Sequence, residues 1–163
     1  MVNSESVSGW TIINSTMVAV SLTLLVLVIG LIDRVPKISL YLMLPSFVMF
    51  LNAIFANNKI LEKISDKKHA QKWDDFATAC FDAGLTFLIS AFAVLSYKVV
   101  DIVSAAIFLA FVWGVAIAFN VYNGMRGKYL LKRFSRNHII VWFAIEFFFL
   151  LLILADYFGM AVL

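Results

Sequence analysis

The stretch that decides the fold is Trp10–Ile32, which reads WTIINSTMVAVSLTLLVLVIGLI and contains no acidic or basic side chain. A helix of about 20 apolar residues is long enough to cross the roughly 30 Å hydrocarbon core of a bilayer. Four further apolar blocks of similar length follow, at 38–58, 76–97, 102–122 and 139–160. The sequence therefore predicts an all-α, polytopic membrane protein: one transmembrane domain over 1–163, built as a bundle of about five transmembrane helices.

The overall composition agrees with a membrane protein. Of the 163 residues, 63% are hydrophobic and 14% are charged, whereas soluble domains have roughly 45–50% apolar and about 25% charged residues. The excess of apolar side chains is expected to face lipid.

The N-terminal segment does not resemble a secretory signal. It lacks a basic region, and the only charged side chain before Trp10 is Glu5. We therefore expect the first helix to be an uncleaved anchor. Cys80 is the only cysteine and lies in an apolar block, which excludes an internal disulfide and a cysteine-rich metal site.

The distribution of basic residues predicts the orientation. Ten Lys and Arg residues lie in the polar segments 59–75 and 123–138, and three lie in the short turns on the other side. The long segments carry Lys59, Lys63, Lys67, Lys68, Lys72, Arg126, Lys128, Lys132, Arg133 and Arg136, and the turns carry Arg34, Lys37 and Lys98. Because basic loops stay on the cytoplasmic side, both long segments are predicted as cytoplasmic loops. The N-terminus is then cytoplasmic, and the plasma membrane is the expected location.

The second cytoplasmic segment mixes basic and apolar residues. Lys128, Lys132, Arg133 and Arg136 are interspersed with Tyr, Leu and Phe side chains. This pattern is suited to binding anionic lipid headgroups, and the electrostatic attraction contributes about 1 kcal/mol for each basic residue near the membrane surface. The simpler interpretation, an ordinary positive-inside loop, stays open.

The third block carries a polar stripe. Thr78, Asp82, Thr86 and Ser90 recur every four residues and so lie along one side of a helix. Asp82 is about 9 Å beyond the start of the block at Phe76, at 1.5 Å per residue. A carboxylate at this depth is costly unless it faces protein or water or is protonated, so it indicates a functional site.

A second acid, Glu146, interrupts the fifth block, which enters the membrane from the same side. We expect Glu146 and Asp82 to lie at similar depth. Asn14, Asn52 and Asn120 stand on the other three helices near the same level. Each predicted helix thus contributes a polar group to one layer.

Two interpretations of this polar layer remain. Carboxylate and amide oxygens are suited to a dehydrated cation, and neighbouring carboxylates can share a proton. Alternatively, the same groups form interhelical hydrogen bonds worth about 1 kcal/mol each.

The fourth block has a stripe of small residues: Ala106, Ala110, Gly114 and Ala118. Small residues let two helix backbones approach closely, so this stripe is predicted to pack against another helix, in this chain or in another copy.

Other kinds of site are not indicated. His69 and His138 lack the spacing of a metal site, and no phosphate-binding loop or nucleophile motif is present. We expect no cofactor, no metal and no nucleic-acid partner. Asp156, near the chain end, is expected at the outer surface.

Three functions are compatible with these features. The first is a small cation- or proton-conducting protein, channel or carrier, assembled from several copies, with Asp82 and Glu146 at the conducting site. The second is a non-catalytic membrane subunit or adaptor that packs against other membrane proteins and anionic lipid. A membrane enzyme acting on lipid is disfavoured, because no nucleophile or headgroup clamp accompanies the two acids.

Overall fold

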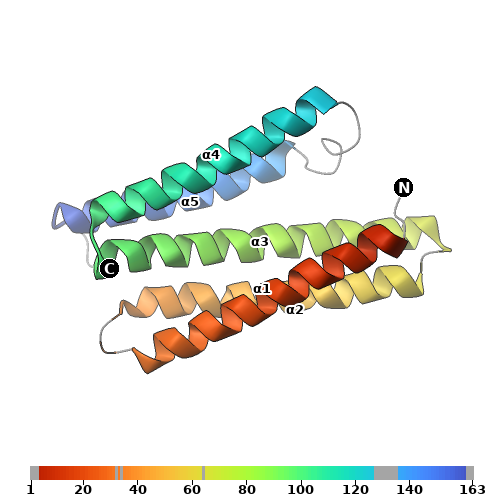
Figure 1. The fold of residues 1–163 in the computed structure, drawn as a ribbon, viewed down its shortest axis with the longest axis horizontal. Coiled ribbons are helices and arrows are strands. Elements are labelled where there is room, and N and C mark those ends of the chain that lie inside the picture. Colours follow the sequence, from red (N-terminus) through yellow and green to blue (C-terminus); the bar gives the residue numbers. More distant parts are fainter. Residues whose placement is uncertain (1–3, 32, 34, 64, 127–135, 161–163) are drawn as a thin grey trace. The chain divides into compact units, whose positions relative to one another are not determined.

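The computed structural model describes residues 4–31, 33, 35–63, 65–126 and 136–160, and over these residues the chain consists of five helices and no strand (Figure 1). The helices are α1 (Ser4–Gly30), α2 (Lys37–Glu62), α3 (Lys67–Val99), α4 (Ile102–Arg126) and α5 (Arg136–Tyr157). The prediction of an all-α fold is confirmed. Of the side chains at 4–6, 115–126, 136–140 and 142, nothing is described.

Three of the helices are long and apolar enough to cross a membrane: Val7–Gly30 in α1, and the whole of α2 and α3. In α4 the described side chains form a shorter apolar stretch, Ile102–Gly114. The chain is thus a membrane protein with several transmembrane helices, and the crossing by α4 and α5 stays a prediction.

The prediction of a loop over 59–75 is wrong for most of these residues, because α2 continues to Glu62 and α3 already begins at Lys67. A hydropathy pattern ends where charged residues begin, but a helix can continue into the polar region with its charged side chains in water. The predicted loop 123–138 is likewise helical at both ends, up to Arg126 and from Arg136, and 127–135 lies outside the described residues.

Two helices begin at an aspartate that caps them. Asp66 accepts a hydrogen bond from the His69 backbone N–H (3.2 Å), and Asp101 accepts one from the Ser104 N–H (2.6 Å). These backbone bonds stabilise the ionised carboxylates and hold the pKa of both Asp66 and Asp101 below the usual value. The caps fix where α3 and α4 start.

The described contacts divide the chain into two compact units. Unit 1 comprises Met1–Ile32 and Leu40–Leu88, and unit 2 comprises Asp33–Ser39 and Ile89–Leu163. Helix α3 contributes its first part to unit 1 and its last part to unit 2. The prediction of a single transmembrane domain stays a prediction.

Unit 1 is a three-helix arrangement in which α2 runs antiparallel to α1 and α3 (Figure 1). Its buried residues repeat at intervals of seven, the spacing at which a helix keeps one seam against its neighbours. The buried positions at this spacing are Val7, Asn14 and Ser21 on α1, Ser46, Ala53 and Ile60 on α2, and Ala70, Ala77 and Gly84 on α3. Of these, Val7, Ile60 and Ala70 form one packed cluster with Trp73.

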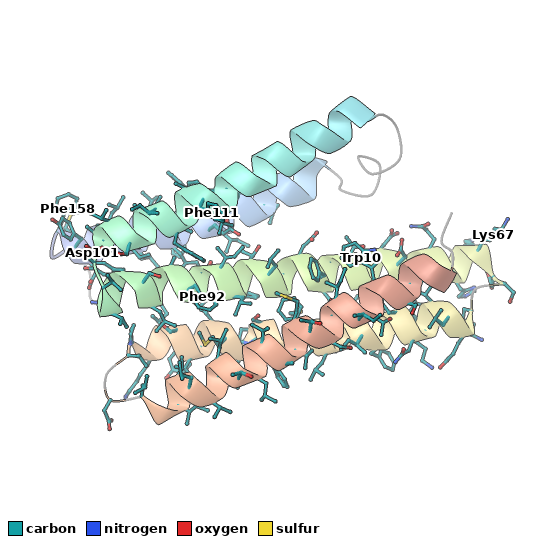
Figure 2. The ribbon with its side chains drawn as sticks, in the orientation of Figure 1. Trp10, Lys67, Phe92, Asp101, Phe111 and Phe158 are labelled. Carbon is teal, nitrogen blue, oxygen red and sulfur yellow. The ribbon has the colours of Figure 1, made fainter. Side chains whose placement is uncertain are left out.

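Ser46 and Gly84 show how closely α2 and α3 approach. The Ser46 hydroxyl donates a hydrogen bond to the Gly84 backbone carbonyl (2.8 Å). A Cβ on Gly84 would lie 3.0 to 3.2 Å from carbons of the Phe50 ring. A side chain at this position would therefore require the Phe50 ring to move by a few tenths of an ångström. Phe81 of α3 contacts both Phe50 and Trp10, with ring centroids 5.8 and 5.4 Å apart. Figure 2 labels Trp10, which lies on α1.

Unit 2 packs the end of α3 against α4 and α5. Its core is formed by Ala93, Val94, Leu109 and Ile153. At the end of α5, the Asp156 carboxylate accepts hydrogen bonds from the Tyr97 hydroxyl (2.7 Å) and the Lys98 ammonium (2.6 Å). These bonds join the ends of α3 and α5.

Candidate functional site

The polar stripe predicted on α3 is present, and it begins earlier than predicted. Thr78 and Asp82 are half-buried, whereas Thr86 and Ser90 are buried. Asp74, one turn before Thr78, is only 4% exposed and continues the same spacing. We call the five residues Asp74, Thr78, Asp82, Thr86 and Ser90 the α3 stripe. It covers about 24 Å of helix at 1.5 Å per residue, most of a roughly 30 Å hydrocarbon core.

Glu146 is buried on α5 and held by a neighbour on α4. The Trp113 indole N–H donates a hydrogen bond to Glu146 Oε2 (2.7 Å), and the same indole meets the Phe143 ring edge-on at 6.1 Å. Glu146 belongs to unit 2 and Asp82 to unit 1, so their common depth stays a prediction.

The three predicted asparagines have different environments. Asn14 is 2% exposed, and its Oδ1 has no hydrogen-bond partner among the described residues. Asn52 is half-buried on α2. Asn120 lies on α4, but its side chain is outside the described part.

Five buried polar residues in the described part of the chain escaped the sequence interpretation: Ser21, Ser39, Ser46, Asn57 and Asp74. Asn57 (3% exposed) and Asp74 were placed close to or within a cytoplasmic loop, because hydropathy averages over all faces of a helix. The signal that could have found Asn57 is its place seven positions after the apolar Phe50, which puts both residues on the same side of α2.

The small-residue stripe on α4 is exposed. Ala106, Ala110 and Gly114 are all exposed in the described structure, and a Cβ on Gly114 would meet nothing within 4 Å. The side chain of Ala118 lies outside the description. Packing of this stripe against another helix stays a prediction.

The predicted lipid-binding residues cannot be placed. Lys128, Lys132 and Arg133 lie outside the described residues, and Arg136 begins α5 with its side chain outside the description.

The remaining candidates have structural environments. Cys80 is a buried free thiol on α3. His69 is exposed, and its Nδ1 lies 2.6 Å from Asp66 Oδ2. Within the described part of the chain, no group of three or more His, Cys, Asp or Glu side chains is arranged to hold a metal ion.

Comparison with known proteins found no match to a protein family, to a curated protein or to a solved structure.

Proposed function

We propose that this chain is a small membrane protein that conducts protons or small cations along the α3 stripe, with Asp82 as the central acid and Glu146 as a second acid. It works as an assembly of several copies, in the plasma membrane, as a channel or carrier without catalytic activity.

The observation that carries the proposal is the length and burial of the α3 stripe. Five acid and hydroxyl side chains at one-turn intervals extend over about 24 Å of α3. Chains of acids with other polar groups within transmembrane helices mark ion and proton pathways. Three of the five, Asp74, Thr86 and Ser90, are buried inside the protein.

The experiment is ion flux into liposomes that contain the purified protein, with protons, Na⁺ and K⁺ tested separately. Asp82→Asn is expected to reduce flux on the order of tenfold, as when a barrier rises by about 1.4 kcal/mol. Glu146→Gln is expected to reduce the flux or its pH dependence in the same assay.

The hydroxyls of the stripe have a matched control. Thr86→Val removes a buried hydroxyl and is expected to reduce flux, whereas Thr23→Val removes an exposed one that bonds only to the Ala19 carbonyl of its own helix and should leave flux unchanged. Loss of assembly in Asp82→Asn, seen by gel filtration, would instead show that the acid holds the fold together.

A second function, a non-catalytic adaptor for other membrane proteins, is favoured by the exposed face of Ala106, Ala110 and Gly114. Its test is purification in mild detergent. A different chain in stoichiometric amount, with no flux above empty liposomes, would favour the adaptor.

A further inference from the structure

One side of α2 carries only apolar and aromatic side chains over most of its length. The exposed residues from 41 to 55 are Tyr41, Leu44, Val48, Leu51 and Phe55. They recur at steps of three and four residues, so they form a single stripe along the helix, whereas the buried side chains of α2 lie on its other side. We call these five residues the α2 apolar stripe.

A lysine continues the α2 apolar stripe at each end. Lys37 stands four residues before Tyr41, and Lys59 stands four residues after Phe55. At 1.5 Å per residue the two lysines are about 33 Å apart along the helix, close to the roughly 30 Å thickness of a hydrocarbon core. Lysine lays its apolar stem on a helix and holds its ammonium group in water. This side of α2 therefore matches a bilayer in both length and charge.

Aromatic rings gather at the Lys59 end of the α2 apolar stripe. The Lys59 ammonium lies 5.6 Å from the centroid of the Phe55 ring. Phe55 meets Trp73 of α3 edge-on at 5.9 Å, and Trp73 meets Phe76 in the same way at 6.0 Å. Phe55 and Phe76 are both exposed. Because tryptophan is enriched where lipid chains meet headgroups, this group of residues marks that boundary on unit 1.

The charges at this boundary favour an anionic headgroup. A lysine ammonium has three N–H donors, and Lys59 uses one of them on Glu62 Oε2 (2.7 Å). The Lys63 backbone N–H bonds to the Lys59 carbonyl (3.2 Å), so the exposed Lys63 adds a second ammonium one turn further on. The exposed acid on this part of α3, Asp75, accepts a hydrogen bond from Gln71 (2.9 Å). Two ammonium groups next to one carboxylate leave this end of α2 positive.

A second copy of the chain fits this side of α2 less well. Two copies with the same orientation in the membrane, related by a two-fold axis, would bring Lys59 of one copy next to Lys59 of the other. Like charges would then meet at the edge of the hydrocarbon core. A phospholipid instead offers an acyl chain to the apolar residues and a phosphate to the lysines.

We propose that an anionic phospholipid of the cytoplasmic leaflet binds to unit 1, with an acyl chain along the α2 apolar stripe and its phosphate at Lys59 and Lys63, beside Trp73. The cytoplasmic leaflet holds the anionic lipids that attract basic residues. The site does not depend on ion conduction. Because Asp74 directly follows Trp73, the same placement puts the start of the α3 stripe at the level of the headgroups.

The test is fluorine NMR of the full chain in lipid bilayer discs, with its four tryptophans replaced by fluorotryptophan. The Trp73 signal is the one absent from Trp73→Phe. A lipid with a nitroxide next to its headgroup should broaden this signal more than a lipid with the nitroxide at the end of its acyl chain. At equal content, an anionic nitroxide lipid should broaden it more than a zwitterionic one.

Each of these comparisons can overturn the proposal without a variant. Stronger broadening by the chain-end nitroxide would place Trp73 in the hydrocarbon core. Equal broadening by anionic and zwitterionic lipids would remove the headgroup preference. A Trp73 signal that no lipid broadens would show that protein, such as a second copy, covers this side of unit 1.

Two lysines provide a matched pair of variants. Lys59→Gln is expected to lower the preference for the anionic lipid at Trp73 several-fold, because one ammonium at the headgroup is lost. Lys68 is also exposed, but it stands five residues before Trp73 and so on a different side of α3. Lys68→Gln should therefore keep the preference. The same preference in both variants would overturn the role of Lys59. Since no ion flux is measured, these results hold whether or not the chain conducts.

Discussion

At the scale of single residues, the polar side chains of α1 separate into two kinds. Thr11, Ser15, Thr16, Ser21 and Thr23 each donate to a backbone carbonyl three or four residues earlier in the same helix. Such bonds need no partner elsewhere. The buried Asn14 side chain differs, because its Oδ1 accepts no hydrogen bond from the described residues.

The bond between Trp113 and Glu146 gives a residue-scale prediction. Trp113→Phe keeps a ring against Phe143 but removes one donor from a buried carboxylate, so it should destabilise the protein by about 1–3 kcal/mol. The measurement is unfolding in detergent followed by circular dichroism. In a double-mutant cycle with Glu146→Gln, the two changes should couple by about 1 kcal/mol. Strictly additive effects would show that the bond contributes nothing.

At the scale of elements, α3 is the helix on which both the packing and the site depend. In its apolar stretch, 61% of the residues are buried, against 22% for α1 and 33% for α2. Its small residues, such as Ala77 and Gly84, allow close helix contacts, while the acids and hydroxyls of the α3 stripe provide the polar side chains.

Gly84 and Gly114 form a matched pair for testing helix contacts. Gly84→Ala places a methyl group 3.0 Å from the fully buried Phe50 ring, and this overpacking, at about 1–3 kcal/mol, should exceed the roughly 1 kcal/mol gained in helix propensity. The midpoint of unfolding should therefore fall. Gly114→Ala meets nothing within 4 Å and should leave it unchanged or raise it. Equal effects would contradict the described packing of α2 and α3.

At the scale of the whole molecule, the sequence predicted the helices better than the site. Apolar blocks located all five helices, because hydrophobic length is set directly by the bilayer. They did not show that α2 extends as far as Glu62 or that α3 begins as early as Lys67. Charged residues outside the hydrocarbon core can still be part of a helix, so the end of an apolar block does not mark the end of the helix. Asp74 and Asn57 were missed for a different reason: hydropathy averages over all faces of a helix, whereas the burial of these two side chains depends on which face meets a neighbour.

The orientation of the chain can be tested with single cysteines in a Cys80→Ala background. Ser65 and Val100 are exposed in the two connections that flank α3. With the N-terminus in the cytoplasm, a membrane-impermeant thiol reagent should label Val100→Cys in intact cells and Ser65→Cys only after permeabilisation. The reverse pattern would show that the distribution of basic residues misled the assignment.

The most direct test of the α3 stripe as an interior pathway compares two adjacent carboxylates. Asp74 is 4% exposed, whereas Asp75 is exposed and bonds to Gln71 on the surface. In liposomes, Asp74→Asn should lower proton flux on the order of tenfold, which corresponds to about 1.4 kcal/mol, while Asp75→Asn should match the wild type. Equal flux in both variants, or no wild-type flux above empty liposomes, would contradict conduction along the stripe.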